Sequence, residues 1–302
     1  MLITGAGGFV GRNLVEYLTA MYEIYPMRHS DLDLLDAGAV KDFFAANPVD
    51  AVLHCAAVGG SRLTGYDATE ADVVEKNLRM FFNLERSLPA AAFMIHLGSG
   101  AEYNRHHWQK EMSESYFDEH VPVDVYGFAK YAIAKYIGYR KNITCFRIFG
   151  LFGKYEDYRY KFISNAIVKN LLHMPIVINQ NVVFDYLYID DFCRIIGNFL
   201  KNRPKYSHYN ITPGEPIDLI SVGKLINEIG EYQSPIHIIH DGMNREYTGS
   251  NARLMDELGD YPFVSYREAV RALYGYYKTV LNALDVQSIR EDPYLEACLY
   301  QN

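Results

Sequence analysis

The stretch LITGAGGFVGRNLVEYL, residues 2–18, decides the fold of this chain. It reads as a short apolar strand, a glycine-rich turn and a helix with apolar residues at helical spacing. Gly5, Gly8 and Gly11 follow a G-x-x-G-x-x-G spacing, a variant of the dinucleotide fingerprint. A backbone without Cβ atoms can approach a pyrophosphate closely, and the first turn of the helix, with Phe9 and Val10, offers free N–H groups. The stretch therefore predicts a dinucleotide-binding site, with an ordinary tight turn as the alternative.

The end of the next predicted strand indicates which dinucleotide binds. YEIYPM, residues 22–27, is followed by Arg28 and His29 rather than by an acidic residue. An acidic side chain would bind the ribose 2′-hydroxyl of NAD, whereas an arginine suits the 2′-phosphate of NADP. Arg12, just after the glycine turn, is a second candidate for that phosphate, and each arginine has a solvated surface charge as its alternative. We expect NADP, with NAD possible, and expect Asp36 either to face the adenine amino group or to cap a helix.

Strands and helices continue to alternate through the first half of the chain. This rhythm predicts an α/β fold, a Rossmann-type doubly wound parallel sheet with helices on both faces, together with a smaller C-terminal substrate-binding domain. Residues 1–150 form the dinucleotide-binding core, and late segments near 183–212 return to it. Residues 151–302 are mostly the substrate-binding domain, which is therefore discontinuous. We expect Asp190 or Asp191 to be the N-cap of the helix that follows YLYI.

Three side chains form a candidate catalytic set. Ser99 ends the apolar strand IHLGS, at the carboxyl edge where doubly wound folds bind ligands. The helix after it contains Tyr-x-x-x-Lys twice, as Tyr126 with Lys130 and as Tyr131 with Lys135. Residues four apart share a helix face, and a nearby ammonium lowers the pKa of a tyrosine so that it can exchange protons near neutral pH. The two pairs point about 140° apart, so only one of them can face a cofactor.

These features resemble the extended short-chain dehydrogenase/reductase family, which includes the NAD-dependent epimerases and dehydratases of nucleotide sugars. The resemblance rests on the TGAGGFVG turn, the strand-end serine, the Tyr-x-x-x-Lys helix, the segment AAVGG from Ala56, and FDYLYIDD near position 190. Within the family, the early region looks closest to GDP-fucose synthases, and a later region resembles nucleotide-diphosphate-sugar 4-ketoreductases. The resemblance implies that Ala56, Ala57 and Asn77 contact the cofactor.

The resemblance also selects one of the two tyrosine–lysine pairs. The family carries its tyrosine in a Y-G-x-[AS]-K context, which Tyr126 to Lys130 matches and Tyr131 to Lys135 does not. It implies that Tyr126 is the acid/base, that Lys130 also holds the nicotinamide ribose, and that Ser99 polarises the substrate oxygen. The second pair is then structural or lies at an interface.

Departures from the family narrow the reaction. Gly100 and Ala101 stand where the dehydratases carry an acidic pair, so dehydration is not expected. Ala101 and Lys161 stand where fucose synthases carry a cysteine and a histidine, so a double epimerisation is not expected either. The leading hypothesis is reduction of the C4 ketone of a nucleotide-diphosphate 4-keto-6-deoxyhexose. A C4 epimerase with tightly bound NAD and a non-catalytic dinucleotide sensor are the alternatives.

The substrate side of the site is harder to assign. Phe184 occupies the place of an arginine that often grips the diphosphate, so other residues must neutralise that charge. Glu102 is either a substrate contact or a surface carboxylate, and Lys169 is expected to be a solvated helix charge. The candidate substrate contacts are Glu102, Lys154, Arg159, Lys161, Asn165 and Arg245.

Composition limits the remaining possibilities. The 302 residues are 49% hydrophobic and 22% charged, as in a soluble globular protein, and carry a formal net charge of −8. That charge argues against nucleic acid as a partner, since phosphate binding relies on clustered cations. Four scattered cysteines show no metal spacing, and no apolar run is long enough to span a membrane. We expect a cytoplasmic protein without a metal site, and the resemblance to the family implies a homodimer.

Overall fold

The computed structural model of the protein describes residues 1–59 and 72–299. Its N-terminal half contains β1 (Leu2–Thr4), α1 (Phe9–Leu18), β2 (Tyr25–Met27), α2 (Ala37–Ala46), β3 (Ala51–His54), α3 (Asp72–Ser87), β4 (Phe93–Ser99), α4 (Val125–Ile137) and β5 (Ile143–Ile148). Three short 3-10 helices, η1 (Gly100–Tyr103), η2 (Arg105–His107) and η3 (Glu114–Tyr116), lie between β4 and α4.

The C-terminal half is made of shorter strands and more helices. It contains β6 (Gly150–Phe152), α5 (Phe162–Leu171), β7 (Ile176–Asn181), β8 (Val183–Phe184), β9 (Tyr186–Tyr188), α6 (Ile189–Lys201), β10 (His208–Ile211), β11 (Ile217–Asp218) and α7 (Leu219–Ile229). It ends with β12 (Ile236–Met243), α8 (Ala252–Leu258), α9 (Tyr266–Val280), η4 (Leu281–Ala283), α10 (Val286–Arg290) and α11 (Pro293–Leu299).

The centre of the molecule is a parallel sheet buried on both faces. Its six strands lie in the order β10-β5-β4-β3-β1-β2, and every neighbouring pair is parallel. Alternate residues of one strand enter opposite cores: Ile95 packs with α1 and α6, and Met94 packs with α2, α3 and α4. This is the burial expected of a doubly wound sheet. The predicted α/β fold with a Rossmann-type sheet is therefore confirmed.

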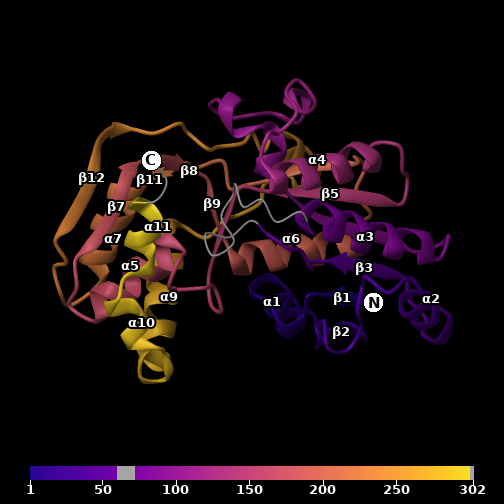
Figure 1. Ribbon diagram of the computed structural model, residues 1–302, viewed down its shortest axis with the longest axis horizontal. Helices are drawn as coiled ribbons and strands as arrows, with labels where there is room; N and C mark the ends of the chain where they lie inside the picture. Colours follow the sequence, from indigo (N-terminus) through magenta and orange to yellow (C-terminus); the bar gives the residue numbers. More distant parts are fainter. Residues whose placement is uncertain (60–71, 300–302) are drawn as a thin grey trace.

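Two late elements complete the N-terminal half. Strand β10 pairs with β5, and α6 packs against α1, so a segment near residue 200 lies among elements of the first 150 residues (Figure 1). The predicted cap of α6 is wrong, because Tyr188 is its N-cap residue and makes no side-chain capping bond. Asp190 and Asp191 lie in the first turn, where the carboxyl group of Asp191 accepts the backbone N–H of Val264.

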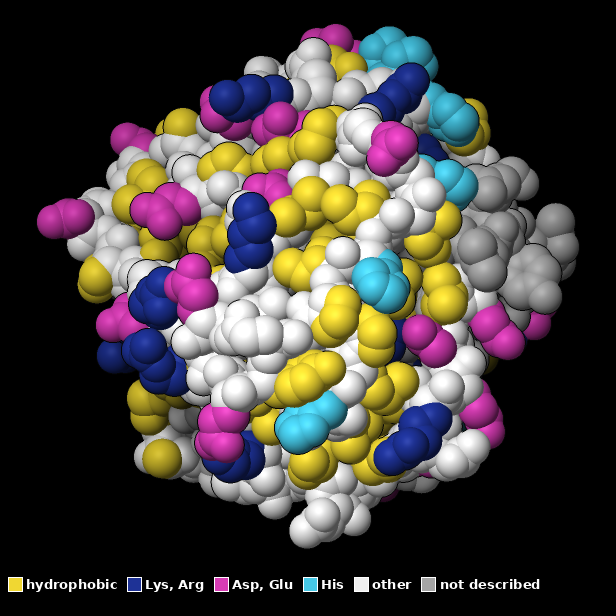
Figure 2. Space-filling view, turned by 90° about the vertical axis from the view of Figure 1, so that its left-hand side faces the viewer, with side chains coloured by type: hydrophobic (Ala, Val, Ile, Leu, Met, Phe, Trp, Pro, Cys, Tyr) yellow, Lys and Arg dark blue, Asp and Glu magenta, His cyan; other side chains and the backbone are white. Residues whose placement is uncertain are grey.

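The remaining C-terminal elements have a hydrophobic core of their own. In this core, α5, α7 and α9 pack around β7, and β7 pairs with β12. Figure 1 shows these elements beside the six-stranded sheet rather than over it. Figure 2 shows this side of the molecule: hydrophobic side chains lie across its middle, and the Lys and Arg side chains drawn there are scattered among acidic ones. Among the described residues, no helix combines the length and apolar character needed to cross a membrane.

Candidate active site

The glycine turn is held tightly between β1 and the start of α1. Gly5 has a φ of +64°, and a Cβ atom there would lie 2.8 Å from the backbone nitrogen of Ala56. A Cβ atom at Gly11 would lie 2.2 Å from the carbonyl oxygen of Gly5. Only glycine fits these two positions without moving the backbone. Gly8 caps α1 without a side-chain bond, so the first N–H groups of the helix have no side chain over them.

A cavity of about 490 Å³ opens at this turn, at the carboxyl ends of β1, β2 and β3. The order of the strands reverses between β1 and β3, and such a switch point is where open α/β sheets bind ligands. Five of the predicted cofactor residues line the cavity. The full lining consists of Thr4, Gly5, Gly7, Gly8, Met27, Arg28, His29, Leu32, Asp33, Leu34, Leu35, Cys55, Ala56, Ala57, Val58, Lys76 and Met80.

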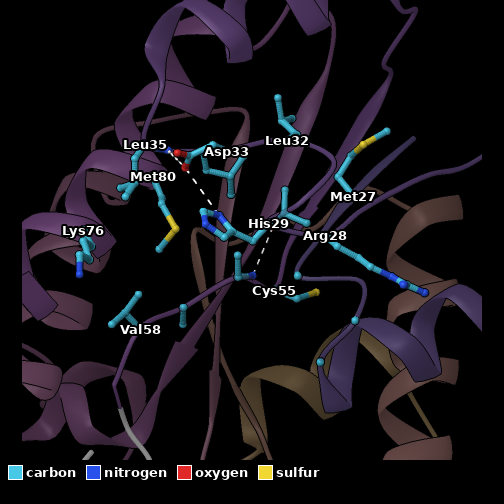
Figure 3. A pocket seen from close by; sticks show the side chains of 17 residues that line it. Met27, Arg28, His29, Leu32, Asp33, Leu35, Cys55, Val58, Lys76 and Met80 are labelled. Atoms are coloured by element: carbon cyan, nitrogen blue, oxygen red, sulfur yellow. Dashed lines mark hydrogen bonds and ion pairs between the residues drawn. The ribbon is translucent and has the colours of Figure 1, made fainter.

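Arg28 lies at the rim of this cavity. A Cβ atom at Gly7 would be 3.6 Å from Cγ and Cδ of Arg28, so the arginine stem lies along the glycine turn. In Figure 3 the Arg28 side chain extends from the end of β2, and Lys76 lies on the opposite wall. Nδ1 of His29 is 3.7 Å from a carboxylate oxygen of Asp33. The rim therefore carries more cationic than acidic side chains.

Arg12 and Asp36, two of the predicted cofactor residues, make other contacts. The guanidinium carbon of Arg12 is 3.6 Å from the ring centroid of Tyr155, and its Nε is 3.6 Å from Glu16, so Arg12 does not line the cavity. Asp36 accepts the backbone N–H groups of Gly38 and Ala39 at 2.8 and 3.0 Å, which makes it the N-cap of α2.

Asn77 is 2% exposed and acts behind the cavity wall. Its amide bonds the backbone N–H and C=O of Val58 at 3.1 and 2.8 Å, and it also bonds the C=O of Val73. It therefore fixes the segment after β3 rather than lining the cavity. Phe9 and Val10 are half-buried and pack against the core beneath α1.

Ser99 caps the 3-10 helix that follows β4. Its Oγ accepts the backbone N–H of Ala101 at 3.1 Å, and its own backbone N–H donates to Oε1 of Glu102 at 2.9 Å, forming a capping box. Because the hydroxyl oxygen already accepts a bond, its proton remains available for donation. Ser99 is half-buried, as a side chain at the edge of a cleft would be.

Tyr126 and Lys130 lie together in the first turns of α4. The Lys130 Nζ is 5.9 Å from the Tyr126 ring centroid and donates a 2.7 Å hydrogen bond to the carbonyl oxygen of Leu97. Burial lowers the pKa of Lys130, and the charge of Glu102 opposes this shift. A Cβ atom at Gly59 would lie 3.4 Å from the Tyr126 ring. Because the preceding residue, Val58, lines the cavity, Tyr126 lies next to the cavity wall.

The second tyrosine–lysine pair has a different partner. Tyr131 and Lys135 both bind the carboxylate of Asp118, in the loop before α4. This pair lies at the surface, a position that fits both a structural role and a place at an interface.

The six candidate substrate contacts do not converge on one point. Lys154 pairs with Glu16 of α1, and Arg159 makes two bonds to Asp157. Asn165 is buried and donates to the carbonyl of Arg159, and Lys161 is the N-cap residue of α5. Arg245 donates to the carbonyls of Arg105 and His106, and the sixth candidate, Glu102, is buried.

Two predicted surface charges are buried instead. Glu102 is 0% exposed and forms an ion pair with Arg147, so it is neither a surface carboxylate nor open to a substrate. Lys169 is also 0% exposed, and its Nζ lies 2.7 Å from a carboxylate oxygen of Asp292. In both cases an oppositely charged partner far away in the sequence offsets the cost of burying the charge. The local sequence does not reveal that partner.

A sequence match supplies the family. It spans residues 1–212 and is to the NAD dependent epimerase/dehydratase family. The chain belongs to this family. It is therefore an NAD(P)-dependent enzyme of the extended short-chain dehydrogenase/reductase type, as the sequence indicated.

Individual relatives of this family member are distant. A GDP-6-deoxy-D-mannose reductase from Pseudomonas aeruginosa is 23% identical over 305 residues, covering 90% of this chain and 95% of the relative. A GDP-mannoheptose C4 reductase from Campylobacter jejuni, solved with NADP bound, has a TM-score of 0.79 at 17% identity, covering 92% of this chain and 97% of that one. A UDP-glucose 4-epimerase from Thermus thermophilus, solved with NAD, has a TM-score of 0.78 at 19% identity, covering 92% and 98%.

The residues of this epimerase/dehydratase family member fit an NAD(P) cofactor. The cradle at Gly5 and Gly11 would be filled by any Cβ atom, and the N–H groups at the start of α1 are open to phosphate. Leu34, Leu35 and Met80 line the cavity beyond Arg28 and were not predicted as site residues. No pattern in α3 distinguished Met80 from the other apolar residues of that helix.

Proposed function

We propose that this protein reduces the C4 ketone of a nucleotide-diphosphate 4-keto-6-deoxyhexose with NADPH. The observation that carries the proposal is the placement of Tyr126 beside the buried ammonium of Lys130, next to the wall of the dinucleotide cavity. Gly100 and Ala101 follow Ser99 without an acidic side chain, which favours reduction over dehydration. In broader terms, the protein is an oxidoreductase that acts on a nucleotide sugar.

The chain itself supplies the proton chemistry. Tyr126 donates its phenolic proton to the oxygen of the reduced carbon, because the ammonium of Lys130 stabilises the phenolate that remains. Ser99 donates a hydrogen bond from its hydroxyl to the same oxygen and keeps its proton, since its own oxygen accepts the backbone N–H of Ala101. Bound NADPH supplies the hydride. The carbonyl of Leu97 fixes Lys130 so that its charge stays close to the tyrosine.

The rim of the cavity supports the preference for NADP. Arg28 would hold the ribose 2′-phosphate, and β2 ends without the acidic residue that would bind a 2′-hydroxyl. Among the described residues that line the cavity, Asp33 is the one carboxylate, and one of its oxygens lies 3.7 Å from Nδ1 of His29. Gly5, Gly8 and the start of α1 would hold the pyrophosphate.

The names of the relatives support reduction at a nucleotide sugar. The Pseudomonas aeruginosa and Campylobacter jejuni proteins are both named as reductases of GDP-linked sugars. By extension, the C-terminal elements around α5 would bind the sugar nucleotide, with Lys161 and Arg245 as the cations for its diphosphate. By the resemblance to the family, we also propose a cytoplasmic homodimer that pairs through helices such as α4, which carries Tyr126, and the helix that follows it.

The experiment is to follow reduced-nicotinamide absorbance with NADPH or NADH and a panel of GDP-, dTDP- and UDP-linked 4-keto-6-deoxyhexoses. We expect stoichiometric loss of NADPH with one of these substrates. The same protein would also be given nucleotide-linked hexoses that carry a C4 hydroxyl, and interconversion of two C4 epimers without net loss of NADPH would instead establish a C4 epimerase. Binding of NADPH with no turnover of any sugar would establish a dinucleotide sensor.

A further inference from the structure

Two residues at the end of β4 bind charged side chains through their backbone, and the glycine between them makes room for one of these side chains. The carbonyl of Leu97 accepts the ammonium of Lys130, and the backbone N–H of Ser99 donates to Glu102. Between them, a Cβ atom at Gly98 would lie 2.3 Å from Oε1 of Glu102. Glycine at position 98 therefore makes the space in which the carboxylate of Glu102 lies.

The partner of Glu102 is as fully buried as Glu102 itself. Arg147 lies on β5 opposite Gly98, is 0% exposed, and binds Oε2 of Glu102 through its Nε. Its Nη1 also donates to the hydroxyl of Tyr103 at 3.3 Å, and Tyr103 donates to Asn210 of β10 at 2.7 Å. The carboxylate is thus anchored across three strands of the sheet.

A buried ion pair contributes little to folding by comparison with apolar residues of the same size. Its presence directly behind Ser99 therefore points to a role in the site rather than in stability alone. We propose that Glu102 is a positioning residue: it holds Ser99 through the backbone N–H and supplies the negative charge that faces Lys130. This inference rests on the proposed reductase function.

Four buried titratable groups near Lys130, two histidines and two cysteines, are neutral at neutral pH. Burial lowers the pKa of His54 to about 3 and that of His96 well below its usual value. Burial likewise raises the pKa of Cys55 to about 12 and that of Cys145 well above its usual range. Glu102, paired with Arg147, carries a negative charge toward Lys130.

Two variants separate the two parts of the role. Glu102→Gln keeps the shape but loses the charge, which lowers the pKa of both Lys130 and Tyr126, because a negative charge favours their protonated forms. The basic limb of the kcat profile should therefore move to lower pH by about half a unit or more. Glu102→Asp keeps the charge, but its shorter side chain no longer reaches the backbone N–H of Ser99. We therefore expect kcat to fall about 10-fold or more, while the basic limb of the pH profile stays at the same pH as in the parent. In both variants the Kd for NADPH should stay within about two-fold of the parent, since Glu102 does not line the cavity.

The measurements are pH profiles of kcat and NADPH binding by fluorescence, with Glu119→Gln as the matched control. Glu119 is an exposed carboxylate in the same segment, and its variant should behave as the parent. A Glu102→Gln protein with the parent's pH limb and kcat would overturn the proposal. If that variant does not fold, Glu102→Asp decides alone, and a kcat within about two-fold of the parent overturns the proposal. A parent without turnover on any sugar contradicts the reductase function instead, before any variant is compared.

Discussion

The ammonium of Lys130 lies 5.9 Å from the ring centroid of Tyr126 and is held there by the carbonyl of Leu97. Lys130 is 3% exposed, so water screens its charge little. Five residues further along the same helix, Tyr131 and Lys135 bind the exposed carboxylate of Asp118 instead. One helix therefore carries two pairs of the same spacing, one with a buried lysine and one at the surface.

The two tyrosines give a matched test of the proton donor. Tyr126→Phe should lower kcat about 10³-fold, because the phenolic proton is lost while the ring remains. Tyr131→Phe removes the same atom from the surface pair and should leave kcat within about two-fold of the parent. Steady-state turnover and NADPH binding would be measured for both proteins. Comparable losses in the two variants would contradict the assignment.

The two arginines give a matched test of the cofactor preference. Arg28→Asp should reduce the preference for NADPH over NADH by about 10- to 100-fold, since a charge-assisted bond to the 2′-phosphate is lost. Arg12→Gln should leave the preference unchanged, because Arg12 stacks on Tyr155 outside the cavity. The ratio of kcat/KM for the two cofactors is the measurement. An unchanged ratio in Arg28→Asp would remove Arg28 from the site.

The buried pair of Lys169 and Asp292 should matter for stability. The side chain of Lys169 is 1% exposed and that of Asp292 is 17% exposed, and the same carboxylate accepts the N–H of Leu295 at the start of α11. Lys169→Met should lower the free energy of unfolding by about 2–4 kcal/mol, because it leaves a partly buried carboxylate without its cation. Urea unfolding measures this, with Lys135→Met at the surface as the control whose midpoint should not change. A parent-like midpoint for Lys169→Met would contradict the prediction.

Glu156 should make stability depend on pH. It is 6% exposed, and burial raises its pKa from 4.5 to about 7, against a 2.6 Å hydrogen bond from the hydroxyl of Ser164. The folded protein therefore holds this proton more tightly than the unfolded chain, so the contribution is full below pH 4.5 and is lost as the pH rises through about 7.

The corresponding variant is Glu156→Gln, which does not titrate. Relative to the parent, it should gain up to about 3 kcal/mol of unfolding free energy between pH 4.5 and pH 8. Urea unfolding of both proteins at several pH values is the measurement. Parallel stability profiles for the two proteins would show that Glu156 does not titrate in this range.

The sequence predicts the parts of the molecule that depend on local pattern. The glycine turn after a strand predicted the cavity at Gly5 and Gly8, and the alternation of strands and helices predicted the sheet. Both signals are short-range: a backbone conformation in one case and a period of apolar residues in the other. The family context also separated Tyr126 from Tyr131, which spacing alone left open.

The sequence does not predict which charges are buried. Glu102 and Arg147 are 45 residues apart, and Lys169 and Asp292 are 123 apart, so their pairing depends on how strands and helices are brought together. Arg12 was assigned to the phosphate because it follows the glycine turn, but α1 turns it toward Tyr155. Side-chain direction on a helix and contacts across the fold decide these cases, and neither is a local property.

The central claim is that this enzyme transfers hydride to C4 of a nucleotide-linked 4-ketosugar while Tyr126 supplies the proton. The most direct measurement uses NADPH deuterated at the transferable position, the 4-ketosugar that gives turnover, and mass spectrometry and NMR of the product. We expect one deuterium atom per product sugar, located at C4, and an equal amount of NADP. Product without deuterium at C4, or formed without consumption of NADPH, would contradict it.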